Sequence, residues 1–230
     1  MKLFAIGDLH LSHASDKPMD VFGPAWDDHA ARIADSWRNI VAEEDVVLIP
    51  GDISWAMHLD EAKADIDFIS ALPGKKIIMR GNHDYWWASL SKVRAILPEG
   101  IYALQNDAVD IGGAVIAGSR GWMCPGSSGF DPDSDRKIYD REAIRLGMSL
   151  DKAGEGKRII AMLHYPPFNE KRNASAFTDL FEKHKVEHVI YGHLHGKSCR
   201  NAFEGVREGI TYTLCSADHI GFAPKFITEI

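Results

Sequence analysis

Five short polar blocks contain the residues of this chain that could bind metal ions or move protons. The blocks are Asp8-Leu9-His10, Gly51-Asp52, Gly81-Asn82-His83-Asp84, His164 and Gly192-His193-Leu194-His195. They offer carboxylate, amide and imidazole groups, and they contain no thiolate. Oxygen and nitrogen donors of this kind suit two divalent metal ions. Two-metal sites mostly hydrolyse phosphoryl esters, so this is the chemistry we expect.

Each block follows an apolar, β-branched run that is typical of a buried strand. The runs cover residues 2–6, 46–49, 76–79, 159–163 and 188–191. In open α/β sheets, ligand groups lie just beyond the carboxyl ends of the strands. We therefore expect the five blocks to act at one place.

The segments between these runs predict an α/β fold. Apolar residues recur at helical spacing over residues 25–43. Further helices are expected over 59–72 and 89–97, each followed by a proline, which gives the β-α-β order of a parallel sheet. Short strands are expected at 102–104, 108–111 and 114–118, followed by an irregular loop at about 119–134. Helices over 135–153 and 174–183 and strands near the C-terminus complete the pattern. We predict a single domain over residues 1–230, with two mixed sheets.

Spacing within the blocks favours shared ligands. Side chains two residues apart point to the same face of an extended segment, so Asp8 and His10 are expected to reach one ion. His193 and His195 repeat this spacing. Asp52 stands alone on its loop and is a candidate to bridge two ions. Further donors are expected from Asn82 and His164.

Composition narrows the classes of partner and the cellular location. The net charge of −7 over 230 residues disfavours a broad nucleic-acid surface, although it does not exclude one. Three widely spaced cysteines form no disulfide framework. The first residues read as a strand rather than a signal peptide, and no stretch has the apolar length of a membrane span. We expect a cytoplasmic protein that acts on a small-molecule phosphate ester away from membranes. The oligomeric state stays open.

In order and spacing, the blocks resemble those of the calcineurin-like metallophosphoesterase superfamily. Its pattern reads D-x-H, G-D, G-N-H-D/E, H and G-H-x-H, and the match extends from residue 8 to residue 195. The resemblance implies a metallophosphoesterase-like α/β fold, a four-layer α/β/β/α sandwich of two mixed sheets. It also implies a hydrolase with two metal ions, which the donors allow to be Mn²⁺, Fe²⁺/Fe³⁺ or Zn²⁺.

The resemblance further implies a role for each matching residue. The residues of one ion's ligand set would be Asp8, His10, Asp52 and His195, and those of the other Asp52, Asn82, His164 and His193. A hydroxide bridging the ions would attack phosphorus, with a phosphodiester as the favoured substrate. His83 would not bind metal; it would be the catalytic residue that assists the leaving group.

Three departures from relatives of the superfamily separate this chain from better-known branches. Many relatives carry a second aspartate in the G-D block that orients the acid histidine, and Trp55 stands in its place here. Protein phosphatases have a phosphate-gripping arginine in this block, whereas Met57, not a lysine or arginine, lies nearby in this chain. Pyrophosphohydrolases of the lipid-A pathway usually carry arginine in place of His83. The resemblance is therefore to a bacterial branch of phosphoesterases and phosphohydrolases with few assigned substrates.

Aromatic and basic residues after the blocks are candidates for substrate binding. Trp55 and Tyr165 directly follow two blocks, and Arg120 and Trp122 open the irregular loop. An aromatic rim would stack on a base or another flat group, and an arginine would hold a phosphate oxygen. The alternative is that these aromatic residues fill the core.

Two other functions of the same fold stay open at this stage. The first is a non-catalytic, metal-binding interaction scaffold, but such proteins have generally lost ligands or the acid histidine, which this chain keeps. The second is a metal-dependent nuclease, against which the acidic charge speaks.

Overall fold

The computed structural model describes residues 1–154 and 156–230, which form two compact units. Unit 1 contains residues 1–103 and 215–230, and unit 2 contains residues 104–214. Each unit has its own sheet and its own hydrophobic core.

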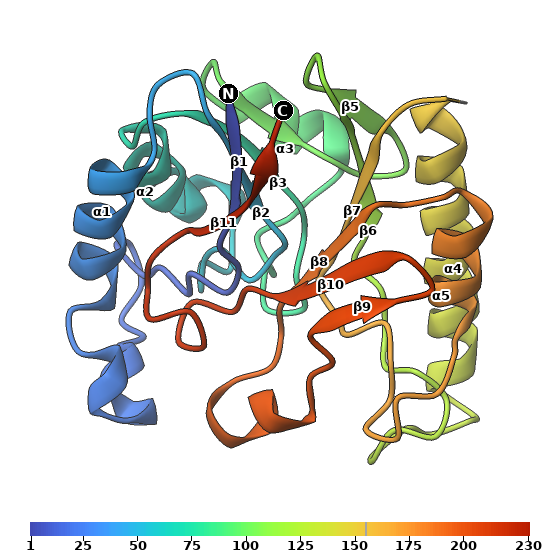
Figure 1. The fold of residues 1–230 in the computed structure, drawn as a ribbon. Helices are drawn as coiled ribbons and strands as arrows, with labels where there is room; N and C mark the ends of the chain where they lie inside the picture. The colour runs from blue at the N-terminus through green and yellow to red at the C-terminus, as the bar shows by residue number, and fades with distance from the viewer. Residues whose placement is uncertain (155) are drawn as a thin grey trace. The chain divides into compact units, whose positions relative to one another are not determined.

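Unit 1 is built on a five-stranded sheet with the order β11-β1-β2-β3-β4. The strands are β1 (Lys2–Ala5), β2 (Val46–Ile49), β3 (Lys75–Ile78), β4 (Ile101–Ala103) and β11 (Lys225–Glu229). The first four run parallel, and β11 pairs antiparallel with β1. This pairing brings the two termini together, as Figure 1 shows. All four residues of β2 are buried, as expected for a central parallel strand covered on both faces.

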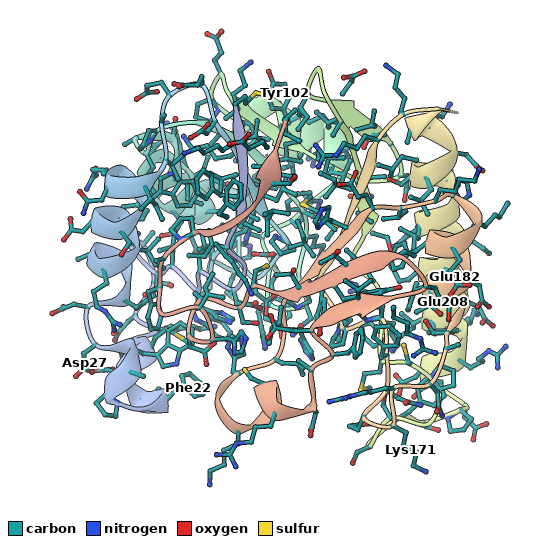
Figure 2. All side chains as sticks on the ribbon, in the orientation of Figure 1. Phe22, Asp27, Tyr102, Lys171, Glu182 and Glu208 are labelled. Carbon is teal, nitrogen blue, oxygen red and sulfur yellow. The ribbon has the colours of Figure 1, made fainter. Side chains whose placement is uncertain are left out.

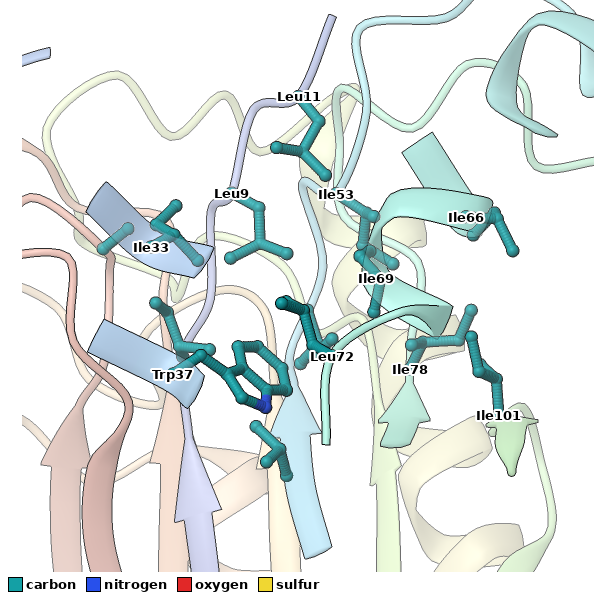
Figure 3. Packing of buried hydrophobic residues seen from close by; sticks show 14 of the residues in the cluster. Leu9, Leu11, Ile33, Trp37, Ile53, Ile66, Ile69, Leu72, Ile78 and Ile101 are labelled. Atoms are coloured by element: carbon teal, nitrogen blue, oxygen red, sulfur yellow. The ribbon is translucent and has the colours of Figure 1, made fainter. Parts of the chain in front are cut away.

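Helices of unit 1 cover the sheet with their apolar sides. They are α1 (His29–Ile40), α2 (Leu59–Ser70) and α3 (Leu90–Ile96), preceded by the 3₁₀ turns η1 (Met19–Phe22) and η2 (Pro24–Trp26). Figure 3 shows Trp37 of α1 packed among aliphatic side chains from the strands, the helices and the loops after β1 and β2. The helix expected over 25–43 is shorter, because Asp28 has a left-handed backbone (φ 50°) that separates η2 from α1.

Unit 2 is built on a six-stranded sheet with the order β5-β6-β7-β8-β10-β9. Its strands are β5 (Ala108–Asp110), β6 (Val115–Ser119), β7 (Ile159–Leu163), β8 (His188–Tyr191), β9 (Gly205–Arg207) and β10 (Ile210–Leu214). Strands β6, β7, β8 and β10 are parallel, and the two edge strands are antiparallel to them. Helix α4 (Asp135–Ala153) packs on β6 and on α5 (Ala176–Lys183), and η3 (Gly196–Asn201) follows β8.

The predicted α/β fold class with two mixed sheets and flanking helices is confirmed. The single-domain organisation stays a prediction. Charged side chains such as Asp27, Lys171, Glu182 and Glu208 stand at the surface (Figure 2). Among the described residues, no helix is long and apolar enough to cross a membrane.

Candidate metal and catalytic site

Every polar block follows a strand of one of the two parallel arrays. In unit 1 the blocks come after β1, β2 and β3, and in unit 2 they come after β7 and β8. Because neighbouring parallel strands end at the same edge of a sheet, each unit collects its own blocks at one edge.

Asp8, His10 and Asp52 form a buried cluster in unit 1, with exposed fractions of 0%, 3% and 1%. Asp8 has ligand atoms within 4.8 Å of ligand atoms of His10 and of Asp52. The distance from His10 Nε2 to Asp52 Oδ2 is 3.9 Å. Two carboxylates held this close and away from water repel each other unless a cation neutralises them. The residues present therefore fit a metal ion.

The backbone brings these donors together in a way that differs from the expected extended segment. The φ angles are +56° at Asp8, +46° at His10 and +50° at Asp52, all in the left-handed region. His193 in unit 2 is also left-handed, at +73°. The predicted extended backbone at Asp8 and His10 is therefore wrong, but ligand atoms of the two side chains do come within 4.8 Å of each other. Local backbone strain is common at functional sites, and here it re-aims each ligand.

The two loops that carry these donors are joined by backbone hydrogen bonds. Asp8 N donates to Gly51 O at 3.0 Å, and His10 N donates to Asp52 O at 3.0 Å. The loop after β1 and the loop after β2 therefore hold their donors in fixed register.

The loop after β3 packs directly against Asp52. His83 N donates to Asp52 Oδ1 at 2.8 Å, and a Cβ atom at Gly81 would overlap the Asp52 carboxylate. Only glycine allows this approach. Asn82 stands between Gly81 and His83 in the chain and is half-buried.

The Asp84 carboxylate joins the loop after β2 to the loop after β3. Within the described part of the chain, none of its hydrogen bonds reaches the side chain of His83. One of its oxygens accepts from Ile53 N at 2.9 Å, Ser54 N at 3.2 Å and Trp86 Nε1 at 2.9 Å. The other accepts from Gly81 N at 2.7 Å. Complete burial, together with the charge of Asp52, raises the pKa of Asp84 to about 7.

His83 is held by rings rather than by a carboxylate. Its Nδ1 atom is buried and has no hydrogen-bond partner among the described residues. The ring centroids of Trp55, His10 and Tyr85 lie 4.6, 5.9 and 6.1 Å from that of His83. Many relatives carry an aspartate at the position of Trp55 to orient this histidine. Among the described residues, no other carboxylate bonds to His83 Nδ1 in its place.

Trp55 contacts two of the predicted site residues. Its ring stacks on His10 at 4.9 Å with an interplanar angle of 23°, in addition to its contact with His83. The indole is fixed from outside by Met19, whose Sδ lies 3.1 Å from Nε1, and by Lys17, whose Nζ lies 5.2 Å from the ring centroid. Trp55 therefore packs against one side of the candidate ligand His10 and of His83 in unit 1.

Unit 2 brings together two of its three predicted ligands. His193 Nδ1 and His164 Nε2 are 3.3 Å apart, and Gly192 N donates to His164 O at 3.1 Å. His164 is fully buried. His195 begins η3, where its backbone N donates to Ser198 Oγ at 2.9 Å.

The predicted substrate residues of unit 2 line up beside these histidines. The ring of Tyr165 lies 4.1 Å from that of His193 and 5.0 Å from that of Trp122. Arg120 stacks on Trp122 at 4.7 Å, and its Nη2 lies 3.6 Å from an oxygen of the buried Glu142. The guanidinium of Arg120 is thus partly neutralised inside its own unit.

Trp86 and Trp87, which also follow a block, are buried in the core of unit 1. These two tryptophans therefore fill the core rather than line a substrate site.

Sequence reasoning missed a buried polar network beside the unit 1 loops. Asp65, 1% exposed, accepts from the backbone N of His13 at 2.9 Å and contacts His13 Nδ1 at 2.7 Å. Its other oxygen accepts a short hydrogen bond from Ser54 Oγ. This network ties the loop after β1 to the start of the loop after Asp52. An acidic residue at a buried helical position was the only signal in the sequence.

Comparison with known proteins finds a matching family model and similar phage proteins. The family model described as calcineurin-like phosphoesterase matches residues 1–197. The Gene 66 protein of Mycobacterium phage D29 is 40% identical over 205 residues, covering 87% of this chain and 82% of the phage protein. The Gene 66 protein of Mycobacterium phage L5 is 24% identical over 188 residues, covering 82% and 74%.

Two solved structures share the fold at low sequence identity. One is phosphopantetheinyl hydrolase from Mycobacterium tuberculosis, with a TM-score of 0.59, 14% identity and coverage of 98% of this chain and 95% of the other. The second is a protein of unknown function from Aquifex aeolicus, with a TM-score of 0.53, 17% identity and the same coverages.

Proposed function

The chain belongs to the calcineurin-like phosphoesterases and is a metal-dependent phosphoric ester hydrolase, and we propose that its substrate is a phosphodiester. The observation that supports the chemistry is the buried cluster of Asp8, His10 and Asp52, whose charges call for a cation.

We assign the donors to two ions by their place in the motif. One ion would be held by Asp8, His10, Asp52 and His195, and the other by Asp52, Asn82, His164 and His193. The chemistry of the donors supports this assignment, because imidazole, carboxylate and amide oxygen suit manganese, iron and zinc. Two separate observations support the assignment. The donors of Asp8, His10 and Asp52 are close together in unit 1, and His164 Nε2 lies 3.3 Å from His193 Nδ1 in unit 2.

When bound, two such ions neutralise the phosphoryl oxygens and supply a nucleophilic hydroxide at neutral pH. The residues of the chain do the remaining work. Asp52 holds the His83 backbone through its Oδ1 atom, and Trp55 packs on the His83 ring. His83 then presents its Nε2 atom to the leaving oxygen and gives it a proton, which lowers the barrier for poor leaving groups.

The charges around the site favour a diester over a monoester. A monoester dianion needs more positive side chains than a diester, which carries one negative charge. Arg120 is engaged by Glu142 and Trp122, and the position after Trp55, where protein phosphatases carry an arginine, is Ala56. We therefore expect these two positions to add little positive charge beside the metal ions.

A metal-supplemented screen tests this substrate class. The purified protein is assayed with Mn²⁺, Fe²⁺ or Zn²⁺ against p-nitrophenyl phosphate, bis-p-nitrophenyl phosphate and inorganic pyrophosphate. We expect the largest kcat/KM on the diester. A higher kcat/KM on the monoester or on pyrophosphate would contradict the diester assignment. Stoichiometric metal without turnover on any ester would instead favour the interaction scaffold.

A further inference from the structure

Unit 2 contains a pocket that borders the predicted ligand His193 and has no role in the proposed chemistry. Its volume is about 210 Å³. Sites that enclose a whole small ligand usually measure about 300–1,000 Å³. This pocket therefore has room for a fragment of a substrate, such as one aromatic ring or a short chain.

The pocket has a wall that is shared with the metal-binding side of unit 2. Tyr165 lines it, and the same ring lies 4.1 Å from the ring of His193. A group seated in the pocket would thus lie beside a ligand of the proposed metal centre. This is the place for the part of an ester that is joined to the reacting phosphate.

Residues 123, 124, 127 and 128 of the irregular loop 119–134 also line the pocket, and this loop is held in place by contacts within unit 2. Asn169 Nδ2 donates to Pro125 O at 3.0 Å, and Ser128 N donates to the Glu170 carboxylate at 3.1 Å. Cys124 Sγ lies 3.7 Å from Pro166 O. Because these bonds join the loop to the segment after His164, the pocket is preformed, which reduces the entropic cost of binding.

The lining predicts an uncharged occupant. Its apolar part includes Met123, Phe168 and Leu194, and its polar part includes Ser127, Asn201 and the Glu170 carboxylate. Among the described residues, no lysine or arginine lines the pocket. A second phosphate or a carboxylate would meet Glu170 without a compensating cation, and burying such a charge is costly.

We propose that this pocket selects the ester group that stays on the phosphate, and that it accepts a flat or aliphatic, uncharged group and rejects an anionic one. This inference rests on the proposed function and adds to it the class of substituent on the diester.

The test uses three diesters with the same p-nitrophenolate leaving group. Their second ester groups are methyl, phenyl and 4-carboxyphenyl, so that only the group in the pocket changes. We expect kcat/KM of the metal-loaded wild type to be about tenfold higher for the phenyl than for the methyl ester. We expect the 4-carboxyphenyl ester to lose this advantage. Equal values for all three esters, or a preference for the carboxylate, would overturn the proposal.

A variant that fills the pocket gives a second reading. Ser127 lines the pocket and is half-buried, so Ser127→Phe should fill the pocket and remove the preference for the phenyl over the methyl ester. The control is Ser91→Phe at an exposed serine of α3. An equal loss on methyl and phenyl esters, or an intact phenyl preference, would overturn the proposal. Absence of metal-dependent hydrolysis of every ester would instead refute the proposed function, and the pocket assignment with it.

Discussion

The indole of Trp55 and the imidazole of His83 are in contact, with ring centroids 4.6 Å apart and an interplanar angle of 50°. The Nδ1 atom of His83 is buried and has no hydrogen-bond partner among the described residues. An aromatic wall therefore fixes this histidine in place of a carboxylate. The orientation of the His83 ring therefore depends on packing.

Trp55→Ala should lower kcat, because the His83 ring loses its main neighbour and adopts other rotamers. We expect a loss of about tenfold on esters with poor leaving groups, a part of what a general acid contributes. Trp55→Phe keeps an aromatic wall and should recover most of the rate. Steady-state kinetics on aryl esters of graded leaving-group pKa measure both variants. Equal loss in the Ala and Phe variants would argue against positioning by the ring.

His83→Ala should leave the metal content unchanged while slowing the chemical step. The loss is expected to be about 10²-fold or more for an alkyl leaving group, which needs a proton, and small for p-nitrophenolate, which does not. Metal analysis and kcat for the two ester types check this. Loss of metal from His83→Ala, or an identical loss on both esters, would show that His83 is not the acid.

Asp84→Ala should destabilise the protein, because it leaves four buried N–H donors on two site loops without an acceptor. Each unsatisfied buried donor costs about 1–3 kcal/mol, so we expect a fall in the free energy of unfolding of about 3 kcal/mol or more. Urea denaturation measures it. Asp84→Asn keeps one acceptor oxygen and should lose less. A change below about 0.5 kcal/mol for Asp84→Ala would contradict the claim that Asp84 holds the two loops together.

The pair Arg158–Glu187 should add a small, pH-dependent stability to unit 2. Arg158 Nε and Nη2 donate to the Glu187 carboxylate at 2.6 and 2.8 Å, and this holds the pKa of Glu187 below its ordinary value of 4.5. His188 Nε2, 3.2 Å from the same carboxylate, acts in the same direction. A carboxyl with a lowered pKa stabilises the fold above the ordinary value, and the effect is lost as pH falls through the folded-state value.

Glu187→Gln should therefore reduce the free energy of unfolding by less than about 1 kcal/mol at pH 7, since both side chains are partly exposed. The difference from wild type should shrink as the pH falls below the ordinary glutamate value. Chemical denaturation across this range measures it, with Glu44→Gln at an exposed glutamate as the control. A difference that grows toward acid pH would have the wrong sign.

The sequence predicted the parts of the fold that depend on local pattern. Helix α4 begins and ends at the residues predicted for it, and the polar blocks follow strands as expected. The backbone at Asp8 and His10 was not predictable, because a left-handed φ at a non-glycine residue is imposed by neighbouring loops rather than by the residue itself.

The supporting contacts of the site were also outside the reach of single-sequence patterns. The hydrogen bonds of Asp84 to the loop after β2 and those of Asp65 to His13 join segments that are 30 to 52 residues apart along the chain. The sequence did mark Trp55 as unusual. Its ring contacts with His10 and His83 depend on three separate loops, so only the fold could reveal them.

The central claim is that Asp52 and its neighbours hold metal ions that hydrolyse a phosphate ester. It is tested most directly by measuring bound metal and turnover of bis-p-nitrophenyl phosphate in the same samples of wild type and Asp52→Asn, before chelation, after chelation and after adding back Mn²⁺, Fe²⁺ or Zn²⁺. We predict that wild type loses activity with its metal and regains both, and that Asp52→Asn binds less metal and shows no turnover. Full activity in the chelated wild type, or an Asp52→Asn variant with wild-type metal content and turnover, would contradict the claim.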